Sequence, residues 1–367
     1  MKEARKKATI KDVALRAGVS PPTVSMVLNG KDAALPERTC ERVRAAAAEL
    51  DYNTDILARA LVTRKTNIVG VVVPDISNAF FSEAVRHIQV EIARYGYDII
   101  LCNSEERAEN DYRYIRLLAG RNVDGLILTP SAEAFTAENA EKMKRLLTGL
   151  RIPYLFFDRY YADGGTRVAV DNEASSYAAT QYLLENGHER IGVIAGPLTL
   201  NSSRNRLKGV RRALSERGLS LPDDCVYEGK YDFATGVNGG AMLLEKGVTA
   251  VFAFSDMQAY GVYESAKRAG KRIPDDVSVM GFDDNIYSSV LEVPLSTMRQ
   301  PVETIAKEVC RAILALIEDE DMEAPACCPA QLVRRSSVAN ISQNKKKQKF
   351  CEGRPSRQVI PAWNYLK

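Results

Sequence analysis

The first helix predicted by the pattern of apolar positions lies close to the N-terminus. Its apolar residues recur at the spacing i, i+3, i+4 and i+7, which places them on one helix face, and they are Ile10, Val13, Ala14 and Ala17. Thr9 precedes this run and can act as the N-cap, and Gly18 follows it and can end the helix. We therefore expect a short amphipathic helix that starts at Ile10.

A second helix begins at two consecutive prolines in the stretch AGVSPPTVSMVLNG. Ser20 can cap it, and Pro21 and Pro22 fall within the first turn, where their missing N–H donors cost little. A third helix is expected from about residue 36 to 50. Two short helices joined by a glycine-containing turn, and followed by a third, form a helix-turn-helix, whose second helix normally lies in the major groove of DNA. The spacing alone also fits a small three-helix cap without a ligand.

From residue 67 the pattern changes to short apolar runs separated by helical stretches. The runs are, in order, IVGVVV, DIILC, GLILT, YLFF, IGVIA, AVFAF and VSVMGF. Strands that are apolar on both faces and alternate with helices indicate parallel sheets covered by helices. The segment is long for one such sheet, so we divide it into two lobes. The expected fold class is thus an all-α helix-turn-helix head followed by a two-lobed α/β body.

Charge is distributed unevenly along the chain. The net charge is only +3 at pH 7, yet residues 1–66 hold 13 Lys and Arg against 8 Asp and Glu, and residues 341–367 hold 7 against 1. The middle of the chain is therefore acidic. A basic front on an acidic body suggests an anionic partner for the front, although a solvated basic arm explains the charge equally well.

The cysteines and histidines narrow the chemistry that the chain can perform. Seven cysteines are scattered without a C-x-x-C pair, which favours reduced thiols in a cytoplasm over a disulfide framework. His87 and His188 are the only histidines, so we expect no metal site and no cofactor. The N-terminal MKEARKKATIKDV lacks the apolar core of a secretory signal, and no apolar run is long enough to cross a membrane.

The stretch from Thr9 to Asn29 reads T-I-x-D-V-A-x-x-A-G-V-S-x-x-T-V-S-x-V-L-N and resembles the signature of the lactose/galactose repressor family. The resemblance implies that Pro21, Pro22 and Met26 occupy the main base-reading positions. Met26 cannot form a bidentate pair with guanine and offers only apolar contact, for example to a thymine methyl. The expected DNA-binding residues of the head are Thr9, Ser20, Pro21, Pro22, Thr23, Ser25, Met26, Asn29 and Tyr52.

Residues 53–66 are expected to form a hinge helix and linker. The segment is too short to be a stable helix alone, and its A-R-A-L at residues 58–61 resembles the hinge of the same family. The resemblance implies that two hinge helices of a dimer lie in the minor groove, with Ala58 and Arg59 at the DNA and Leu61 wedged into a base step. Without the preceding motif, an ordinary interdomain linker would fit equally well.

The resemblance extends to about residue 338 and implies a periplasmic-binding-protein-like body in which three strands cross between the lobes. The basic tail lacks apolar periodicity, so we expect it to be disordered. The expected divisions are a head at 8–52, a hinge at 53–66, a body at 67–338 and a tail at 339–367. Within the body they are an N-lobe at 67–159 and 288–320 and a C-lobe at 160–287 and 321–338.

Polar and aromatic residues follow the predicted strands, where ligands of parallel sheets bind. The candidates for effector binding are Phe80, Phe81, Asp158, Arg159, Arg206, Phe233, Asp256 and Asp283. Carboxylates and guanidinium groups bond hydroxyls, and aromatic rings cover C–H faces, which suits a sugar. Each residue also has a structural interpretation, and Asp256 in particular can cap a helix. The family pattern favours a pocket role for Arg206, Phe233 and Asp283.

The sequence thus predicts a cytoplasmic, sequence-specific DNA-binding transcriptional regulator, a repressor. We expect a homodimer on pseudo-palindromic double-stranded operator DNA, controlled by a small molecule, which the family resemblance implies is a sugar or sugar derivative. Neither G-x-x-x-x-G-K-[ST] nor G-x-S-x-G occurs, so an enzyme is not expected. The alternatives are control by a phosphoprotein co-regulator on the body surface, and a two-lobed sugar-binding transport protein, which would need a signal peptide and no DNA-reading head.

Overall fold

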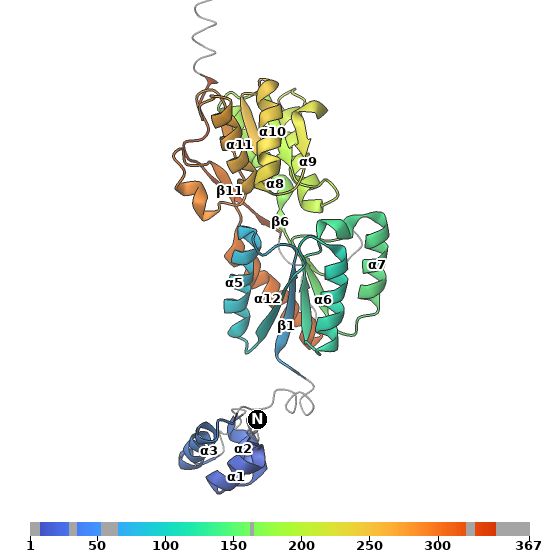
Figure 1. Cartoon of the computed structure of the whole chain (residues 1–367), viewed down its shortest axis with the longest axis vertical. Coiled ribbons are helices and arrows are strands. Elements are labelled where there is room, and N and C mark those ends of the chain that lie inside the picture. Colours follow the sequence, from blue (N-terminus) through green and yellow to red (C-terminus); the bar gives the residue numbers. More distant parts are fainter. Residues whose placement is uncertain (1–7, 29–34, 53–64, 162–164, 321–326, 343–367) are drawn as a thin grey trace, which may run out of the picture. The chain divides into compact units, whose positions relative to one another are not determined.

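The computed structural model describes residues 8–28, 35–52, 65–161, 165–320 and 327–342. The chain divides into two compact units, residues 1–67 and 68–367, and each is described by itself (Figure 1). We refer to them as the head and the body. Among the described residues, no helix is both long and apolar enough to cross a membrane.

The described residues of the head form three helices, as the sequence predicts: α1 (Ile10–Ala17), α2 (Pro21–Leu28) and α3 (Glu37–Glu49). A capping box starts α1, in which the Thr9 side chain accepts from the Asp12 amide and the Asp12 carboxylate accepts from the Thr9 amide. Gly18 ends α1 in the left-handed region, with φ 65°. At the start of α2 the Thr23 amide donates to the Ser20 hydroxyl over 3.3 Å. The prolines therefore mark a helix start.

A parallel sheet with strand order β2-β1-β3-β4-β5 forms the N-lobe of the body. Its strands are β1 (Ile68–Val73), β2 (Asp98–Asn103), β3 (Gly125–Leu128), β4 (Tyr154–Phe157) and β5 (Arg167–Val168). Its helices are α5 (Ala79–Ala93), α6 (Ala108–Gly120), the 3-10 turn η1 (Ala132–Phe135), α7 (Ala137–Thr148) and α12 (Val302–Glu318). Helix α12 comes from far along the chain and packs against α5, β3 and β4 (Figure 1).

A second parallel sheet, with order β10-β9-β7-β8, forms the C-lobe. Its strands are β7 (Ile191–Ala195), β8 (Val226–Glu228), β9 (Ala250–Ala253) and β10 (Ser278–Met280). Its helices are α8 (Asn172–Glu185), α9 (Asn201–Ser215), α10 (Phe233–Glu245) and α11 (Asp256–Arg268), with 3-10 turns η2 (Asp223–Cys225) and η3 (Ile286–Ser289). All seven apolar runs of the sequence lie in strands of these two sheets, which confirms the α/β body with parallel sheets.

Two short strand pairs lie outside the two large sheets. Strand β6 (Val170–Asp171) pairs with β12 (Cys328–Pro329), and β11 (Thr297–Arg299) pairs with β13 (Gln331–Val333). The lobe limits differ from those expected, because β5 pairs with β4 and so extends the N-lobe sheet to Val168. The segment expected to enter the N-lobe at 288 is instead bonded to the C-lobe, since the Ser288 hydroxyl donates to Asp256 over 2.6 Å.

The expectation of a disordered tail from residue 339 is wrong for its first four residues. The Ala339 amide donates to the Ser278 hydroxyl, and the Ile341 amide donates to the Asn186 carbonyl, each over 2.9 Å. His188 is buried here, and its ring contacts the Thr249 hydroxyl and the Ala339 carbonyl. Residues 339–342 thus belong to the C-lobe, and 343–367 lie outside the described part of the chain.

Candidate functional site

The second helix of the head presents two different faces. Val24 and Val27 are buried in the head core, whereas Pro21 and Pro22 are exposed and Met26 is 39% exposed. Burial of the valines leaves the opposite face of α2 available to a partner. This is the face on which the sequence places the base-reading side chains.

The other predicted DNA-binding residues of the head take varied positions. Thr9 and Ser20 are exposed at the starts of α1 and α2, where their hydroxyls also cap the helices. Thr23 and Ser25 are half-buried, and Tyr52 packs partly buried against the head core. Four further predicted residues lie outside the described residues: Asn29, Ala58, Arg59 and Leu61.

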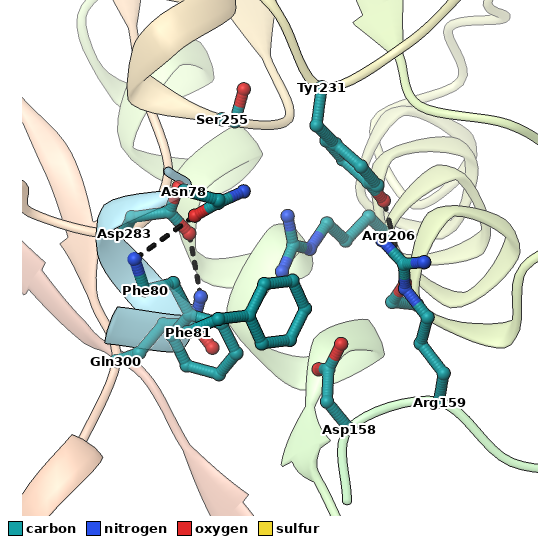
Figure 2. A pocket seen from close by; sticks show the side chains of 11 residues that line it. Asn78, Phe80, Phe81, Asp158, Arg159, Arg206, Tyr231, Ser255, Asp283 and Gln300 are labelled. Carbon is teal, nitrogen blue, oxygen red and sulfur yellow. Dashed lines mark hydrogen bonds between the residues drawn. The ribbon is translucent and has the colours of Figure 1, made fainter. Parts of the chain in front are cut away.

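A pocket in the body brings together six of the eight predicted effector-binding residues (Figure 2). These are Phe80, Phe81, Asp158, Arg159, Arg206 and Asp283, and the empty space between the lining side chains is about 310 Å³, part of it open to solvent. The sequence did not single out five other residues that line the pocket: Asn78, Ser202, Tyr231, Ser255 and Gln300.

The ends of neighbouring elements position the pocket residues. Asn78 caps α5, since its side chain accepts from the Phe80 amide over 3.0 Å, and this sets Phe80 and Phe81 on the first turn. Asp158 follows β4 in the left-handed region, with φ 60°. Its carbonyl accepts from the Asn201 side chain of α9 over 3.1 Å, so the end of an N-lobe strand is tied to a C-lobe helix.

The Arg206 guanidinium is held on several sides within the C-lobe. Its Nε donates to Asn172 Oδ1 over 2.7 Å, and its Nη1 donates to the Phe254 carbonyl. The guanidinium carbon lies 3.6 Å from the Phe282 ring centroid, which is cation–π distance. Figure 2 shows Arg206 and Asp158 pointing toward the same space beside the phenylalanine rings.

The second pocket arginine, Arg159, is bound to a carboxylate. Its two terminal nitrogens donate to the Glu106 oxygens over 2.8 and 2.9 Å, and one also donates to the Pro130 carbonyl. Burial alone raises the pKa of Glu106, but the charge and hydrogen bonds of Arg159 lower it overall. Arg159 is only 2% exposed, and its Nε has no hydrogen-bond partner among the described residues.

The buried carboxyls of the pocket hold their protons more tightly than usual. Burial raises the pKa of Asp158 against the opposing charges of Arg159 and Arg206. It also raises the pKa of Asp283, although Arg206 opposes the shift and Gln300 donates to Asp283 Oδ1 over 2.6 Å. Asp158 Oδ1 and Gln300 Oε1 have no partner among the described residues. Because unpaired buried polar atoms cost free energy, a bound ligand or water would stabilise them.

Two of the predicted effector residues do not line this pocket. Phe233 is 42% exposed at the start of α10, and Tyr231, two residues earlier, lies against the pocket in its place. Asp256 starts α11, and its carboxylate accepts from the Asn285 amide and from two hydroxyls, those of Ser288 and Thr297. Its oxygens are thus used to hold the segment that contains η3, which is a structural role.

The described residues contain no group of three or more His, Cys, Asp or Glu that could hold a metal ion. The titratable side chains that line the pocket are carboxyls, arginines and the Tyr231 phenol, which are hydrogen-bonding groups for a polar organic molecule. Its phenylalanine walls supply apolar surface, with the Phe80 and Phe81 ring centroids 5.1 Å apart. The arrangement is therefore typical of a binding pocket.

Comparisons with known proteins match both units. Residues 9–55 match the family of bacterial regulatory proteins described as the lacI family, and residues 180–338 match a periplasmic binding protein-like domain. A similar relative is the HTH-type transcriptional repressor PurR of Vibrio campbellii, 35% identical over 320 residues, which cover 86% of this chain and 94% of the relative.

Solved structures of DNA-bound and sugar-bound regulators are also similar. The Lac repressor dimer bound to operator and the anti-inducer ONPF has a TM-score of 0.80 at 26% identity, covering 91% of this chain and all of the other. The transcriptional regulator CelR in complex with cellobiose has a TM-score of 0.68 at 29% identity, covering 90% of this chain and 99% of that one.

Proposed function

Since this chain belongs to the lacI family of bacterial regulatory proteins and is a DNA-binding transcriptional repressor rather than an enzyme, we propose that a sugar in the body pocket controls its binding to operator DNA. The observation that carries the proposal is the pocket itself. Its aromatic walls, carboxyls and arginines gather around unpaired buried polar atoms, which a hydroxyl-rich molecule would satisfy.

The chemistry of the unpaired atoms favours a hydroxyl-rich ligand. Asp158 Oδ1 and Gln300 Oε1 are acceptors, and Arg159 Nε is a donor. A hydroxyl both donates and accepts, so a sugar can bond to either kind of atom while its C–H face packs against a phenylalanine. The cellobiose complex of a similar regulator supports this class. A planar heterocycle such as a purine base is the second class to screen, because it could also pack against the Phe80 and Phe81 rings.

On the DNA side, we propose that a homodimer places two copies of α2 in successive major-groove half-sites and two hinge segments, residues 53–66, in the minor groove between them. The exposed α2 face with Pro21, Pro22 and Met26 supports the first part. The similar Lac repressor structure is a dimer bound to operator, which supports the second copy. Two-fold symmetry would then fix a pseudo-palindromic operator. Since chromosomal DNA is the target, the protein would act in the cytoplasm.

The DNA proposal is tested by selecting binding sites from a random pool of duplexes with the full-length protein. We expect a pseudo-palindrome, bound with an affinity that falls steeply as salt rises. A variant lacking residues 1–60 serves as the control and should select nothing. Selection of a site without two-fold symmetry, or equal binding by the truncated variant, would contradict the proposal.

The effector proposal is tested by thermal shift of the full-length protein against sugars and purine bases. A sugar that raises the melting temperature should also change operator affinity, and operator DNA should change the affinity for that sugar by the same factor. Asp158→Asn should abolish the shift, whereas Phe233→Ala, which alters an exposed side chain outside the pocket, should preserve it. A purine base as the only active compound would overturn the sugar assignment and leave the pocket assignment intact.

A further inference from the structure

A wider cleft with an acidic lining adjoins the effector pocket. It shares Asn78 and Tyr231 with the pocket and has an empty volume of about 1280 Å³, part of it open to solvent. Its lining contains five carboxyl groups, which we call the acidic mouth: Asp75, Glu105, Glu106, Glu133 and Asp232. Among the described residues, the cationic side chains that line the same cleft are Arg107 and Lys230, and Glu106 is in addition paired with Arg159. A ligand that extends from the pocket through this cleft therefore passes an excess of carboxyl groups.

Backbone geometry and hydrogen bonds fix carboxyls of the acidic mouth in place. Glu105 and Glu106 both adopt positive φ, 54° and 57°, a conformation that costs a non-glycine residue roughly 1 kcal/mol or more. Glu106 also accepts from the Ala132 amide over 2.7 Å, and Asp232 caps α10 by accepting from the Thr235 amide over 2.8 Å. Because the carboxyls of Glu106 and Asp232 are bonded to backbone amides, these two cannot swing away from an incoming negative charge.

The arginines of the pocket have little capacity left for an anion. The terminal nitrogens of Arg159 are bonded to Glu106. Nη1 of Arg206 is bonded to the Phe254 carbonyl, and the ring of Phe282 lies against the face of this guanidinium. A phosphate is best bound by a free guanidinium fork, which neither arginine offers. It would also meet the buried Asp158 carboxyl.

The pocket also contains a buried acceptor atom that has no hydrogen-bond partner among the described residues. Asp158 is only 5% exposed and lines the pocket, and its Oδ1 accepts no hydrogen bond from any described residue. An unpaired buried acceptor is satisfied by an N–H or O–H donor and not by an anionic oxygen. The unpaired acceptor in the pocket and the carboxyl groups of the acidic mouth therefore both disfavour an anionic ligand.

We propose that the effector is an uncharged or cationic polyhydroxy compound, such as a free sugar or an amino sugar, and that the acidic mouth rejects its phosphate ester. The inference rests on the proposed function, whose ligand class it narrows. Glu105 acts here as a specificity residue, because it is exposed at the mouth and does not line the inner pocket. An anionic ligand would be repelled by the mouth without contacting Glu105 directly.

The test is a calorimetric comparison of matched ligands on the full-length protein. The pairs are glucose and glucose 6-phosphate, fructose and fructose 6-phosphate, ribose and ribose 5-phosphate, and adenosine and adenosine monophosphate, with glucosamine, cellobiose and inorganic phosphate added. We expect the uncharged or amino compound of a binding pair to bind at least about 10-fold more tightly than its phosphate ester. Glu105→Gln should reduce the ratio of the two affinities, because it removes one negative charge from the acidic mouth. In the wild type, 0.5 M salt should also reduce this ratio, because salt screens the repulsion.

The matched control is Glu141→Gln, which removes the same charge from the exposed surface of α7, outside the acidic mouth, and should leave the ratio unchanged. A phosphate ester that binds as tightly as its parent sugar, or inorganic phosphate that binds to the wild type, would overturn the inference while leaving a sugar-type effector in place. Binding of adenosine but not of adenosine monophosphate, with no sugar bound, would overturn the sugar class and support the rejection of phosphate esters. A panel in which nothing binds would overturn the inference and the proposed function together.

Discussion

At the scale of single residues, two aspartates with the same sequence signal differ in role because their surroundings differ. Asp256 and Asp283 both follow strands of the C-lobe sheet; Asp256 is buried and Asp283 is half-buried. The Asp256 carboxylate receives three hydrogen bonds from the backbone and hydroxyls of one segment. Asp283 receives one side-chain bond, from Gln300, and lines the pocket. Of the two aspartates, only Asp283 therefore remains available to a ligand.

Asp283 should give the body a pH-dependent stability that its amide variant lacks. Because burial raises its pKa above the unfolded value, the folded state binds more protons than the unfolded state, and the wild type loses stability as pH rises above about 4. Asp283→Asn cannot ionise, so its melting temperature relative to wild type should increase between pH 5 and pH 8. One pKa unit is worth about 1.4 kcal/mol, so we expect a relative gain of at least roughly 2–4 °C.

The measurement is thermal unfolding of both proteins across this pH range. The neighbouring carboxyls Asp158 and Asp256 also have raised pKa values, so the comparison uses the difference between variant and wild type rather than either profile alone. Asp223→Asn, where the side chain is 95% exposed, is the control for removing one surface carboxyl. A constant difference for Asp283→Asn would contradict the burial argument.

At the scale of elements, local signals define the starts of the head helices. The capping box of Thr9 and Asp12 satisfies two backbone amides that the first turn of α1 leaves unpaired. Thr9→Ala removes the hydroxyl acceptor and should destabilise the head by about 1 kcal/mol. Hydrogen exchange at the Asp12 amide should become several-fold faster, while Thr9→Ser should behave like the wild type. Unchanged exchange in Thr9→Ala would show that the box contributes little.

The pairing of α10 with α11 depends on close approach of their backbones. A Cβ atom built at Gly236 would lie 2.1 Å from the Gln258 carbonyl oxygen, which is backbone that cannot move aside cheaply. Gly236→Ala should therefore destabilise the body by roughly 1–3 kcal/mol through overpacking. Gly120→Ala is the matched control, since it also lies in a helix but has no atom within 4 Å of the added carbon. Chemical denaturation of both variants measures the difference, and equal stability of the two would contradict the packing argument.

At the scale of the whole molecule, the head and the body must be linked for a ligand to affect DNA. The hinge carries this link in our proposal, and its residues 53–64 lie outside the described part of the chain. The family resemblance predicts that Leu61 of the hinge wedges into a base step, and substitution of this residue tests the prediction. Leu61→Ala should weaken binding to the selected operator far more than binding to random duplex, because the wedge acts only where a base step is opened. Equal losses on both DNAs, measured by fluorescence anisotropy at one salt concentration, would argue against a wedge.

The parts of the fold set by short-range interactions could be predicted from the sequence. The spacing of Val24 and Val27, the cap at Ser20 and the stop at Gly18 each involve residues within one or two helical turns, and the structure places them as expected. The long apolar runs became strands for the same reason, since a strand buried on both faces needs an uninterrupted apolar segment. Strands of two or three residues, such as β5 and β12, were missed because so short a pair carries no such pattern.

The composition of the site was decided by the tertiary structure. Tyr231 lines the pocket and Phe233 does not, although both are aromatic and follow the same strand, because α10 begins between them and turns Phe233 toward solvent. The bond between Glu106 and Arg159 joins residues 53 positions apart, which only the order of the strands brings together. Sequence by itself thus determined the helices, the strands and the family, since these depend on local free energies and a contiguous motif. Which side chains meet, and which are already occupied by other partners, depended on how distant segments pack.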